Sequence, residues 1–581
     1  MRLFFDIETN AIEDWVKFSD LKKLHCIVVS VDGGEPQQVS PDQFKSLVEK
    51  ADELVGHNIM AFDLPALRKL IGFVPECRVI DTLLLSRLKF ADLRNDEFQL
   101  INDGFPKELV GSHSLKAWGH RLKMHKGECE NFEEFTPEML EYCKQDVRIT
   151  SLLYHNLDID DMAEAAVEIE HRFAEIVRKQ ERTGFRFDVE AAERLHADLL
   201  KEKLHIESNM RKVFPDKVIE RVSEKTGKKL KPKVEEFNPG SRMQIAERLM
   251  EKYGWQPVEM TPDGRPRVDE SVLESLDYPE AKFLASYLTC IKRLGQLADG
   301  DNAWLKLHRN GRLHGRVNTN GAVTGRCTHS SPNMAQVPTD PAYRSLFVPN
   351  EGLVLVGADA SGLELRCLAH FLGKYDGGDY ARKVISCDIH WENAKAFGLA
   401  PQQQQDKANP SHKAARNQAK GGIYALIYGA ADTKLGMVLG GDSKKGKKSR
   451  ANFYAAVPAF QKLKDDVEKI VSSKGHLKGI DGRILPIRSP HAALNTLLQS
   501  AGAVIMKKAC ILAHDEYEAK NIPVAQVAAV HDEYQLMCFP QHADEVGKIM
   551  VEAIQDAGKS FGFRCPLDGE YRVGKNWAET H

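Results

Sequence analysis

Two apolar segments that carry aspartates, far apart in the chain, limit the folds open to it. The run LVLVGAD ends at Asp359, and AAVHDEYQL places Asp532 between two strand-like stretches. A buried strand that ends in an acid delivers its carboxylate to an open sheet edge, and an acid in a short polar turn lies at the tip of a hairpin. Only a fold that both segments share can bring the two carboxylates together.

The size of the chain indicates several structural units. Its 581 residues exceed what one ordinary hydrophobic core accommodates. A hydrophobic content of 42% and a charged content of 28% are typical of a globular protein rather than a fibrous or disordered one. The net charge of -3 does not exclude a nucleic-acid ligand, because 80 Lys and Arg balance 83 Asp and Glu and can be sorted onto different faces.

Cysteine usage and the opening residues indicate a cellular compartment. The eleven cysteines include no CxxC pair and no His/Cys cluster at zinc spacing, which argues against a disulfide framework and a structural zinc site. Acids appear in MRLFFDIETN too early for a signal peptide, and no run of about 18 apolar residues follows. We therefore expect a cytoplasmic protein without a membrane segment.

The hydrophobic pattern changes along the chain. The first part reads as α/β, with strands in RLFFDIE and HCIVVSV and a helix in PEMLEYCKQDVRITSLLYHNL. A mostly helical region follows, and then a mixed region with a further helix in SHKAARNQAKGGIYALIYGA. A lysine-rich insert, EKTGKKLKPKVEE, interrupts the first helical region. It is either a solvated loop or a flexible contact to a phosphate backbone.

A first set of carboxylates lies in the α/β part. Asp6 and Glu8, at i and i+2 of a strand, leave the same face of a sheet. Asp63 has apolar neighbours in HNIMAFDLPAL, and Tyr142 and Asp146 are neighbours on one helix face. Carboxylates on one face repel each other unless a cation lies between them, so a hard divalent metal is their natural companion.

A stripe of cationic and aromatic residues lies between the two aspartates of the second set. Arg416, Lys420, Tyr424 and Tyr428 recur every four residues in a helical segment and so share one face. Such a stripe is either a solvated helix edge or a nucleotide site, with a triphosphate on the cations and a base or sugar on the ring.

Six ordered motifs resemble those of known enzymes. DASGLELR, RNQAKGGIYALIYGA and VHDE resemble motifs A, B and C of family A DNA polymerases. GSHSLKAWGHRL, HGRVNTNGAVTGRCTHSSPNMAQVP and IRSPHAALNTLLQSAGA also match, and the resemblance extends from end to end to the replicative polymerases of short-tailed bacteriophages. D-x-E, HNxxxFD and YxxxD, in that order, resemble the 3′→5′ proofreading exonucleases.

The resemblance implies a multidomain α/β and α+β protein. Its ribonuclease-H-like exonuclease domain precedes a right-hand polymerase with an antiparallel palm sheet and helical thumb and fingers. The implied ranges are 1–160 for the exonuclease, 161–300 for the thumb, 301–375 and 491–581 for the palm, and 376–490 for the fingers.

The resemblance also implies roles for the two carboxylate sets. Each would hold two Mg²⁺ ions. In the exonuclease the metal ligands would be Asp6, Glu8, Asp63 and Asp146, with Tyr142 orienting the attacking water. In the polymerase they would be Asp359 and Asp532, serving the primer 3′-hydroxyl and the triphosphate.

Further residues are implied to contact the incoming nucleotide or the DNA. Arg416, Lys420 and His390 would contact its phosphates, Tyr424 would pack on it, and Glu364 would exclude a ribose 2′-hydroxyl. The residues implied to contact DNA are Arg326, Tyr428, Asn495, Gln499 and His531. Arg326, Asn495 and Gln499 would test the shape of a base pair in the minor groove. Glu533, like His531, would lie near the primer end.

The chain differs from known members of the family in two places. The exonuclease motif begins at residue 6, which leaves no room for the 5′ nuclease of bacterial polymerase I. Only residues 214–236 stand where the best-studied phage relatives carry a long thioredoxin-binding insertion, so thioredoxin recruitment is not expected.

Expected partners are primer-template DNA and dNTPs, and a helicase-primase and a single-strand-binding protein remain open. Two alternative functions are a nuclease whose polymerase half only holds DNA, and a non-catalytic replisome factor. The presence of the acids of both carboxylate sets argues against both alternatives.

Overall fold

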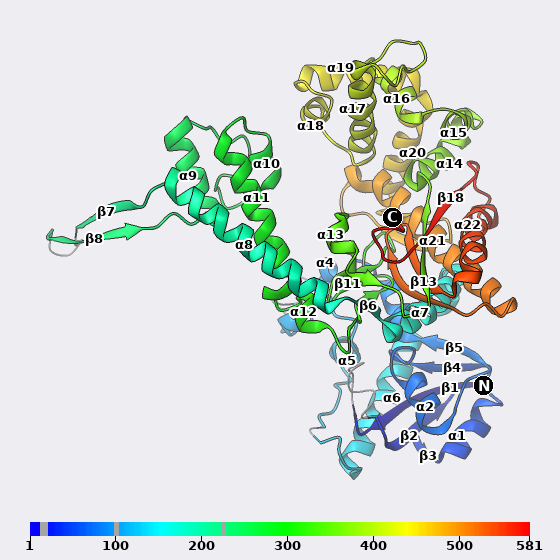
Figure 1. Ribbon diagram of the computed structural model, residues 1–581. Coiled ribbons are helices and arrows are strands. Elements are labelled where there is room, and N and C mark those ends of the chain that lie inside the picture. The colour runs from blue at the N-terminus through cyan, green and yellow to red at the C-terminus, as the bar shows by residue number, and fades with distance from the viewer. Residues whose placement is uncertain (12–20, 98–100, 102–103, 130, 223–226) are drawn as a thin grey trace.

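The computed structural model describes residues 1–581 except 12–20, 98–100, 102–103, 130 and 223–226. Figure 1 shows an N-terminal sheet domain below, a helical lobe to one side, and a second sheet crowned by helices. The fold class expected from the resemblance is confirmed, since an α/β domain precedes an antiparallel sheet flanked by two helical regions.

The N-terminal domain is a mixed five-stranded sheet in the order β3-β2-β1-β4-β5. β1 pairs antiparallel with β2 and parallel with β4. The strands are β1 (Arg2–Thr9), β2 (Leu24–Val31), β3 (Gln37–Val39), β4 (Glu53–Gly56) and β5 (Arg78–Asp81). The helices are α1 (Pro41–Val48), α2 (Asp63–Ile71), α3 (Thr82–Lys89), α4 (Leu93–Glu97), α5 (Leu115–Arg121) and α6 (Pro137–Leu157).

Alternation along β1 decides which face carries the acids. Leu3 and Phe5 belong to the core cluster that contains Phe44 of α1, whereas Phe4 belongs to the cluster that contains Cys143 of α6. Because successive side chains point to opposite faces, Asp6 and Glu8 lie on the side of Phe4 and face α6. The helix predicted from PEMLEYCKQDVRITSLLYHNL is confirmed as α6, which begins with Pro137 after the capping side chain of Thr136.

A helical lobe with its own core follows. Its core joins the second half of α8 to α9, α10 and α11 and includes Phe214, Leu249 and Leu284. The elements are α8 (Val189–Val213), α9 (Arg242–Tyr253), α10 (Glu270–Glu274) and α11 (Pro279–Leu294). The lysine-rich insert forms β8 (Lys229–Glu235), which pairs with β7 (Lys217–Val222) in a hairpin that projects from the lobe. The insert is therefore a solvent-exposed strand rather than a loop, and its contact with a phosphate backbone stays a prediction. Residues 223–226 of this segment lie outside the described residues.

One helix of the range expected for the thumb packs elsewhere. α7 (Glu164–Thr183) lies against α21 and β16, and its Phe173 and Val177 join the main core of the C-terminal half. The helical lobe therefore starts at α8, and α7 connects the two halves of the molecule. The other domain boundaries stay predictions.

The C-terminal half is built on an antiparallel sheet in the order β16-β17-β13-β18. Its strands are β13 (Val354–Ala360), β16 (Val524–Val530), β17 (Glu533–Cys538) and β18 (Gly569–Gly574). The long helices α21 (Ala493–Ala519) and α22 (Ala543–Ser560) pack with this sheet in one core. α21 lies in the one segment of the described chain that is long and apolar enough to cross a membrane, Pro490–Ala519, and 78% of its most apolar window is buried within the protein.

Helices above the sheet form the region expected for the fingers (Figure 1). They are α15 (Asp379–Ser386), α16 (Ile389–Phe397), α17 (Pro410–Ile427), α18 (Asp432–Val438), α19 (Ser443–Ala456) and α20 (Pro458–Lys474). α14 (Leu363–Asp376), which precedes them, lies in the range expected for the first part of the palm. Small hairpins and helices complete the half: β6 (Phe185–Phe187), α12 (Trp304–Leu307), β9 (Arg312–Leu313), β10 (Arg316–Asn318), β11 (Thr328–Ser330), α13 (Pro341–Arg344), β12 (Phe347–Val348), β14 (His476–Lys478) and β15 (Ile484–Pro486).

Candidate active sites

The N-terminal carboxylates gather where β1, α2 and α6 meet. Glu8, Asp63 and Asp146 are buried, and Asp6 is partly buried. Ligand atoms of Asp6, Glu8 and Cys143 all lie within 4.8 Å of one another, and the Cys143 thiol donates to Asp6 Oδ2 at 3.4 Å. The structure thus brings together acids from three elements that are distant in the sequence.

Burial and mutual repulsion disfavour the ionised form of these four carboxyl groups. Burial, followed by the neighbouring carboxylates, raises the pKa of Asp6 well above its usual value and that of Glu8 to about 8. Burial is also the main reason that the pKa of Asp63 rises to about 7 and that the pKa of Asp146 is raised. A cation placed among the four groups would reverse these shifts.

The described residues supply one cation, which the sequence did not indicate. Lys126 Nζ lies 2.6 Å from Asp146 Oδ2 and 4.6 Å from the centre of the Tyr142 ring. Lys126 lies in a loop without periodicity, so no pattern could have singled it out. Cys143 could have been found, because it follows Tyr142 and stands three residues before Asp146 on the same helix.

This donor set fits hard divalent metal ions. Four carboxylates offer the oxygen ligands that such ions prefer, and Asp146 Oδ1 is buried without a hydrogen-bond partner. A single lysine cannot balance four converging acids. The residues present therefore fit divalent metal ions better than a purely structural cluster.

The second pair of acids meets at the edge of the polymerase sheet. Asp359, the penultimate residue of β13, lies opposite Glu533 of β17 and Glu570 of β18. Asp532 occupies the β16–β17 turn, and its carbonyl accepts a hydrogen bond of 3.2 Å from the Ala360 N–H. Burial, then the nearby Asp532, raises the pKa of Asp359 to about 7.

Glu533 has other partners. Its Oε1 accepts from the Trp577 indole at 2.5 Å and from Gln535 Nε2 at 2.6 Å, and His581 Nδ1 lies 2.9 Å from Oε2. These contacts tie the buried Glu533 carboxylate to the C-terminal residues, rather than leaving it open beside Asp532.

A pocket of about 170 Å³ adjoins Asp532. It collects several residues expected from the motifs: Arg326, Glu364, Tyr424, His531 and Asp532. The Tyr428 hydroxyl donates to Glu364 Oε2 at 3.2 Å. Burial raises the pKa of Glu364, and burial followed by Glu364 raises the pKa of Tyr424 to about 12. The predicted gate residue Glu364 and Tyr424 thus line one pocket, and Tyr428 is hydrogen-bonded to Glu364.

The phosphate-binding residues expected on α17 have different surroundings. Lys420 is exposed and forms no ion pair within the described chain. Arg416 Nε lies 2.5 Å from Asp388 Oδ2, an acid that the sequence did not indicate. Asp388 also accepts from the His390 N–H at 3.1 Å as the N-cap of α16, so it fixes both Arg416 and His390.

Two further expected residues lie on α21. Asn495 and Gln499 are on the helix that also lines the pocket through Leu498 and Gly502. Asn495 Oδ1 is buried without a partner within the described residues. Their helix thus borders the pocket beside Asp532, while the role of both residues in base-pair reading stays a prediction.

Comparison with known proteins identifies the family of the chain. A model of DNA polymerase family A matches residues 209–579. The chain is 33% identical to the DNA-directed DNA polymerase of Enterobacteria phage T3, with 100% of both proteins covered, and 33% identical to that of Escherichia phage T7, with 99% of both covered. The solved structure of the POL domain of Pol1 from M. smegmatis, in complex with DNA primer-template and dNTP, is similar with a TM-score of 0.79 and 18% identity over 100% of this chain and 96% of that chain.

A right-hand fold with acids at the edge of its central sheet defines a polymerase. The chain belongs to DNA polymerase family A and is a DNA-directed DNA polymerase. Enzymes of this family generally use divalent metal ions, in agreement with the uncompensated acids at Asp359 and Asp532.

Proposed function

We propose that the chain extends a primer by template-directed addition of dNTPs and removes mismatched 3′ ends at a separate exonuclease site during phage genome replication. The observation that carries this proposal is the presence of two acid clusters on two different sheets, one at β1 and one at β13. The phage T3 and T7 relatives, which match over the whole chain, support the replicative setting.

The acids named above would hold Mg²⁺ in each site. Mg²⁺ pairs supply activation of the attacking oxygen and neutralisation of the leaving group in phosphoryl transfer. Asp359 and Asp532 are the ligands in the polymerase, and Asp6, Glu8, Asp63 and Asp146 are those in the exonuclease. At the exonuclease site, Tyr142 orients the water and Lys126 holds Tyr142 and Asp146 in place.

In the polymerase site the fingers residues bind the nucleotide. Lys420, free of an ion pair in the described chain, contacts the triphosphate, and Arg416 joins it while Asp388 keeps its guanidinium in position. Glu364 occupies the space of a ribose 2′-hydroxyl, and its hydrogen bond to Tyr428 fixes that position. Arg326, Asn495, Gln499 and His531 contact the DNA beside the pocket.

A primer-extension assay tests the proposal. A labelled primer on a defined template, with Mg²⁺ and all four dNTPs, should be extended to the end of the template. Omission of one dNTP should stop extension at the template position that requires it. Extension that ignores the template would contradict the proposal.

Substitution of Tyr424 by Phe should change the use of dideoxynucleotides. A dNTP carries a 3′-hydroxyl that can bond its own phosphate, whereas a dideoxynucleotide leaves that place for the Tyr424 hydroxyl. A hydrogen bond to a charged group contributes about 1.5–3 kcal/mol, so Tyr424→Phe should lower relative ddNTP incorporation about ten- to a hundredfold. Competition between ddNTP and dNTP on one template measures the ratio. An unchanged ratio would show that Tyr424 only packs in the pocket.

We expect low intrinsic processivity that falls with salt and does not respond to thioredoxin. The alignment with the T3 enzyme runs over 726 positions, so that relative contains segments that this 581-residue chain lacks. Contacts between cationic residues and phosphates weaken as salt rises, because counterion release drives them. Product lengths under single-hit conditions, with and without thioredoxin, provide the measurement. Strong stimulation by thioredoxin would identify residues 214–236 as a clamp site.

A further inference from the structure

Four charged side chains are buried between α7, α21 and the turn that joins β14 to β15. They are two acids and two bases, each at most 5% exposed: Glu170, Asp481, Arg483 and Lys507. Lys507 Nζ donates to Glu170 Oε1 at 2.5 Å, and Arg483 Nη2 lies 2.8 Å from the same oxygen. Arg483 Nε donates to Asp481 Oδ2 at 2.8 Å, so two acids hold one guanidinium. These four residues are termed the buried ion cluster.

The buried ion cluster fixes the geometry of a guanidinium rather than adding much stability. Burial of ions costs free energy that their mutual attraction seldom exceeds by much. Although burial lowers the pKa of Arg483, the charges of Glu170 and Asp481 raise it above its usual value, so the guanidinium stays ionised. Its planar fork can contact both acids and a further group at fixed angles, which the ammonium of a lysine cannot do.

The further group is the tip of the β10–β11 hairpin, formed by residues 319–327. Asn320 Oδ1 accepts from Arg483 Nη1 at 3.5 Å, and Asn320 Nδ2 donates to the Arg87 carbonyl of α3 at 3.1 Å. A Cβ on Gly325 would collide with Arg483 Nη1. The backbone of the tip therefore lies directly against the guanidinium of the buried ion cluster.

The tip carries Arg326. Its carbonyl accepts two hydrogen bonds of 3.2 Å from the N–H groups of residues 321–322, which closes the tip on itself. The Arg326 side chain lines the pocket beside Asp532 together with Glu364. Burial raises the pKa of Glu364 and the positive charge of Arg326 opposes this rise, so the two side chains interact. Arg483 thus contacts the backbone of the tip, and the Arg326 side chain reaches the pocket.

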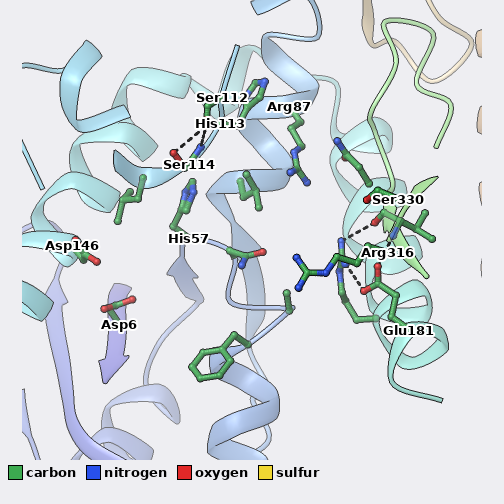
Figure 2. A pocket seen from close by; sticks show the side chains of 18 of the residues that line it. Asp6, His57, Arg87, Ser112, His113, Ser114, Asp146, Glu181, Arg316 and Ser330 are labelled. Carbon is green, nitrogen blue, oxygen red and sulfur yellow. Dashed lines mark hydrogen bonds and ion pairs between the residues drawn. The ribbon is translucent and has the colours of Figure 1, made fainter. Parts of the chain in front are cut away.

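The same face of α7 holds the base of the hairpin. Glu181 is buried, and its Oε1 accepts from the Val317 N–H of β10 at 2.6 Å. Figure 2 shows Glu181 of α7 beside Arg316 of the hairpin. Glu170 and Glu181 are eleven residues apart on α7, which is about three helical turns, so both acids leave one face of the helix. α7 therefore supports the hairpin directly at its base and, through Arg483, at its tip.

We propose that the buried ion cluster positions Arg326 for its contact with the base pair at the primer end. The inference rests on the proposed function, which gives Arg326 a DNA contact beside Asp532, and it adds a positioning role for Glu170, Asp481 and Arg483. A guanidinium displaced by about 1 Å loses the distance and angle that a hydrogen bond requires. Arg483 thus acts on primer extension only through Arg326.

The test is a double-mutant cycle with Arg483→Lys and Arg326→Gln, measured as kcat/KM for addition of one dNTP to a matched primer. Arg483→Lys keeps the positive charge that the two buried acids require, but a lysine does not support the tip. We expect Arg326→Gln to lower kcat/KM about tenfold to a hundredfold, the scale of one hydrogen bond to a charged group, and Arg483→Lys to lower it about tenfold. The loss in the double variant should stay within about twofold of that of Arg326→Gln alone, because Arg483 acts only through Arg326.

Arg172→Lys is the matched control. Arg172 joins the same two helices at the surface, and its partners among the described residues, Glu175 and Asp515, belong to α7 and α21 and not to the tip. The kcat/KM of this variant should match that of the wild type. Thermal unfolding shows whether each variant is folded. If Arg483→Lys does not fold, Gly325→Ala takes its place in the cycle, because the added Cβ separates the tip from the guanidinium.

Three outcomes would count against the inference. Losses that multiply in the double variant would overturn it, because a merely structural role of Arg483 lowers activity whether or not Arg326 is present. Wild-type kinetics of the Arg483→Lys variant, beside a loss in Arg326→Gln, would overturn the positioning role alone. Wild-type kinetics of Arg326→Gln would contradict the DNA contact that the proposed function gives to Arg326, and the inference with it.

Discussion

Asp532→Ala should stop primer extension and leave degradation of single-stranded DNA intact. Removal of one group that stabilises transition-state charge typically costs about 100- to 1,000-fold, so we expect at least that loss in extension rate. The turn itself should survive, because Asp532 contributes its backbone carbonyl to the bond with Ala360. Exonuclease activity should persist, because its acids belong to another sheet.

Asp544→Ala provides the control for this variant. Asp544 is an exposed acid in the same half, and its carboxylate accepts from the Tyr571 hydroxyl at 3.3 Å, away from the pocket. Asp544→Ala removes one negative charge, as Asp532→Ala does, and the extension rate of the Asp544→Ala variant should match that of the wild type. If the Asp532→Ala variant extends the primer at the rate of the control, Asp532 does not take part in nucleotide addition.

The double variant Asp6→Ala and Glu8→Ala should lose the exonuclease activity and keep primer extension. Loss of two of the four converging acids should reduce exonuclease activity by at least about 100- to 1,000-fold, and extension of a matched primer should be largely unchanged. Removal of acids that burial and mutual repulsion disfavour as anions should not lower thermal stability in the absence of metal.

Its control is Asp42→Ala, a change of an exposed acid in α1 of the same domain. Degradation of single-stranded DNA and extension of a matched primer are measured for both proteins. Parallel loss of both activities in a folded double variant would contradict the model of two independent sites.

Local patterns predicted the parts of the sites that lie within one element. The i, i+2 spacing of Asp6 and Glu8 and the four-residue spacing of Tyr142 and Asp146 fix a shared face, whatever else the chain does. The same holds for Arg416, Lys420 and Tyr424 on α17. The family motifs then indicated which separate elements meet, and comparison with the phage enzymes confirmed the family.

Partners brought in by tertiary packing could not be predicted in this way. Lys126 reaches Asp146 from a loop, and Asp388 reaches Arg416 from the start of another helix. The amphipathic pattern of α7 predicted a buried face but not that α21 and β16 would cover it.

The most direct test of the account is extension of a primer that ends in a mismatch. Labelled primers are followed over time with Mg²⁺ and all four dNTPs, for the wild type and for the Asp6→Ala, Glu8→Ala variant. We predict that the wild type first shortens the primer and then extends it to the end of the template. The variant should leave the mismatched end uncut and extend it slowly, while it extends a matched primer at the wild-type rate. Shortening of the mismatched primer by the variant at the wild-type rate would contradict the assignment of proofreading to the acids of β1.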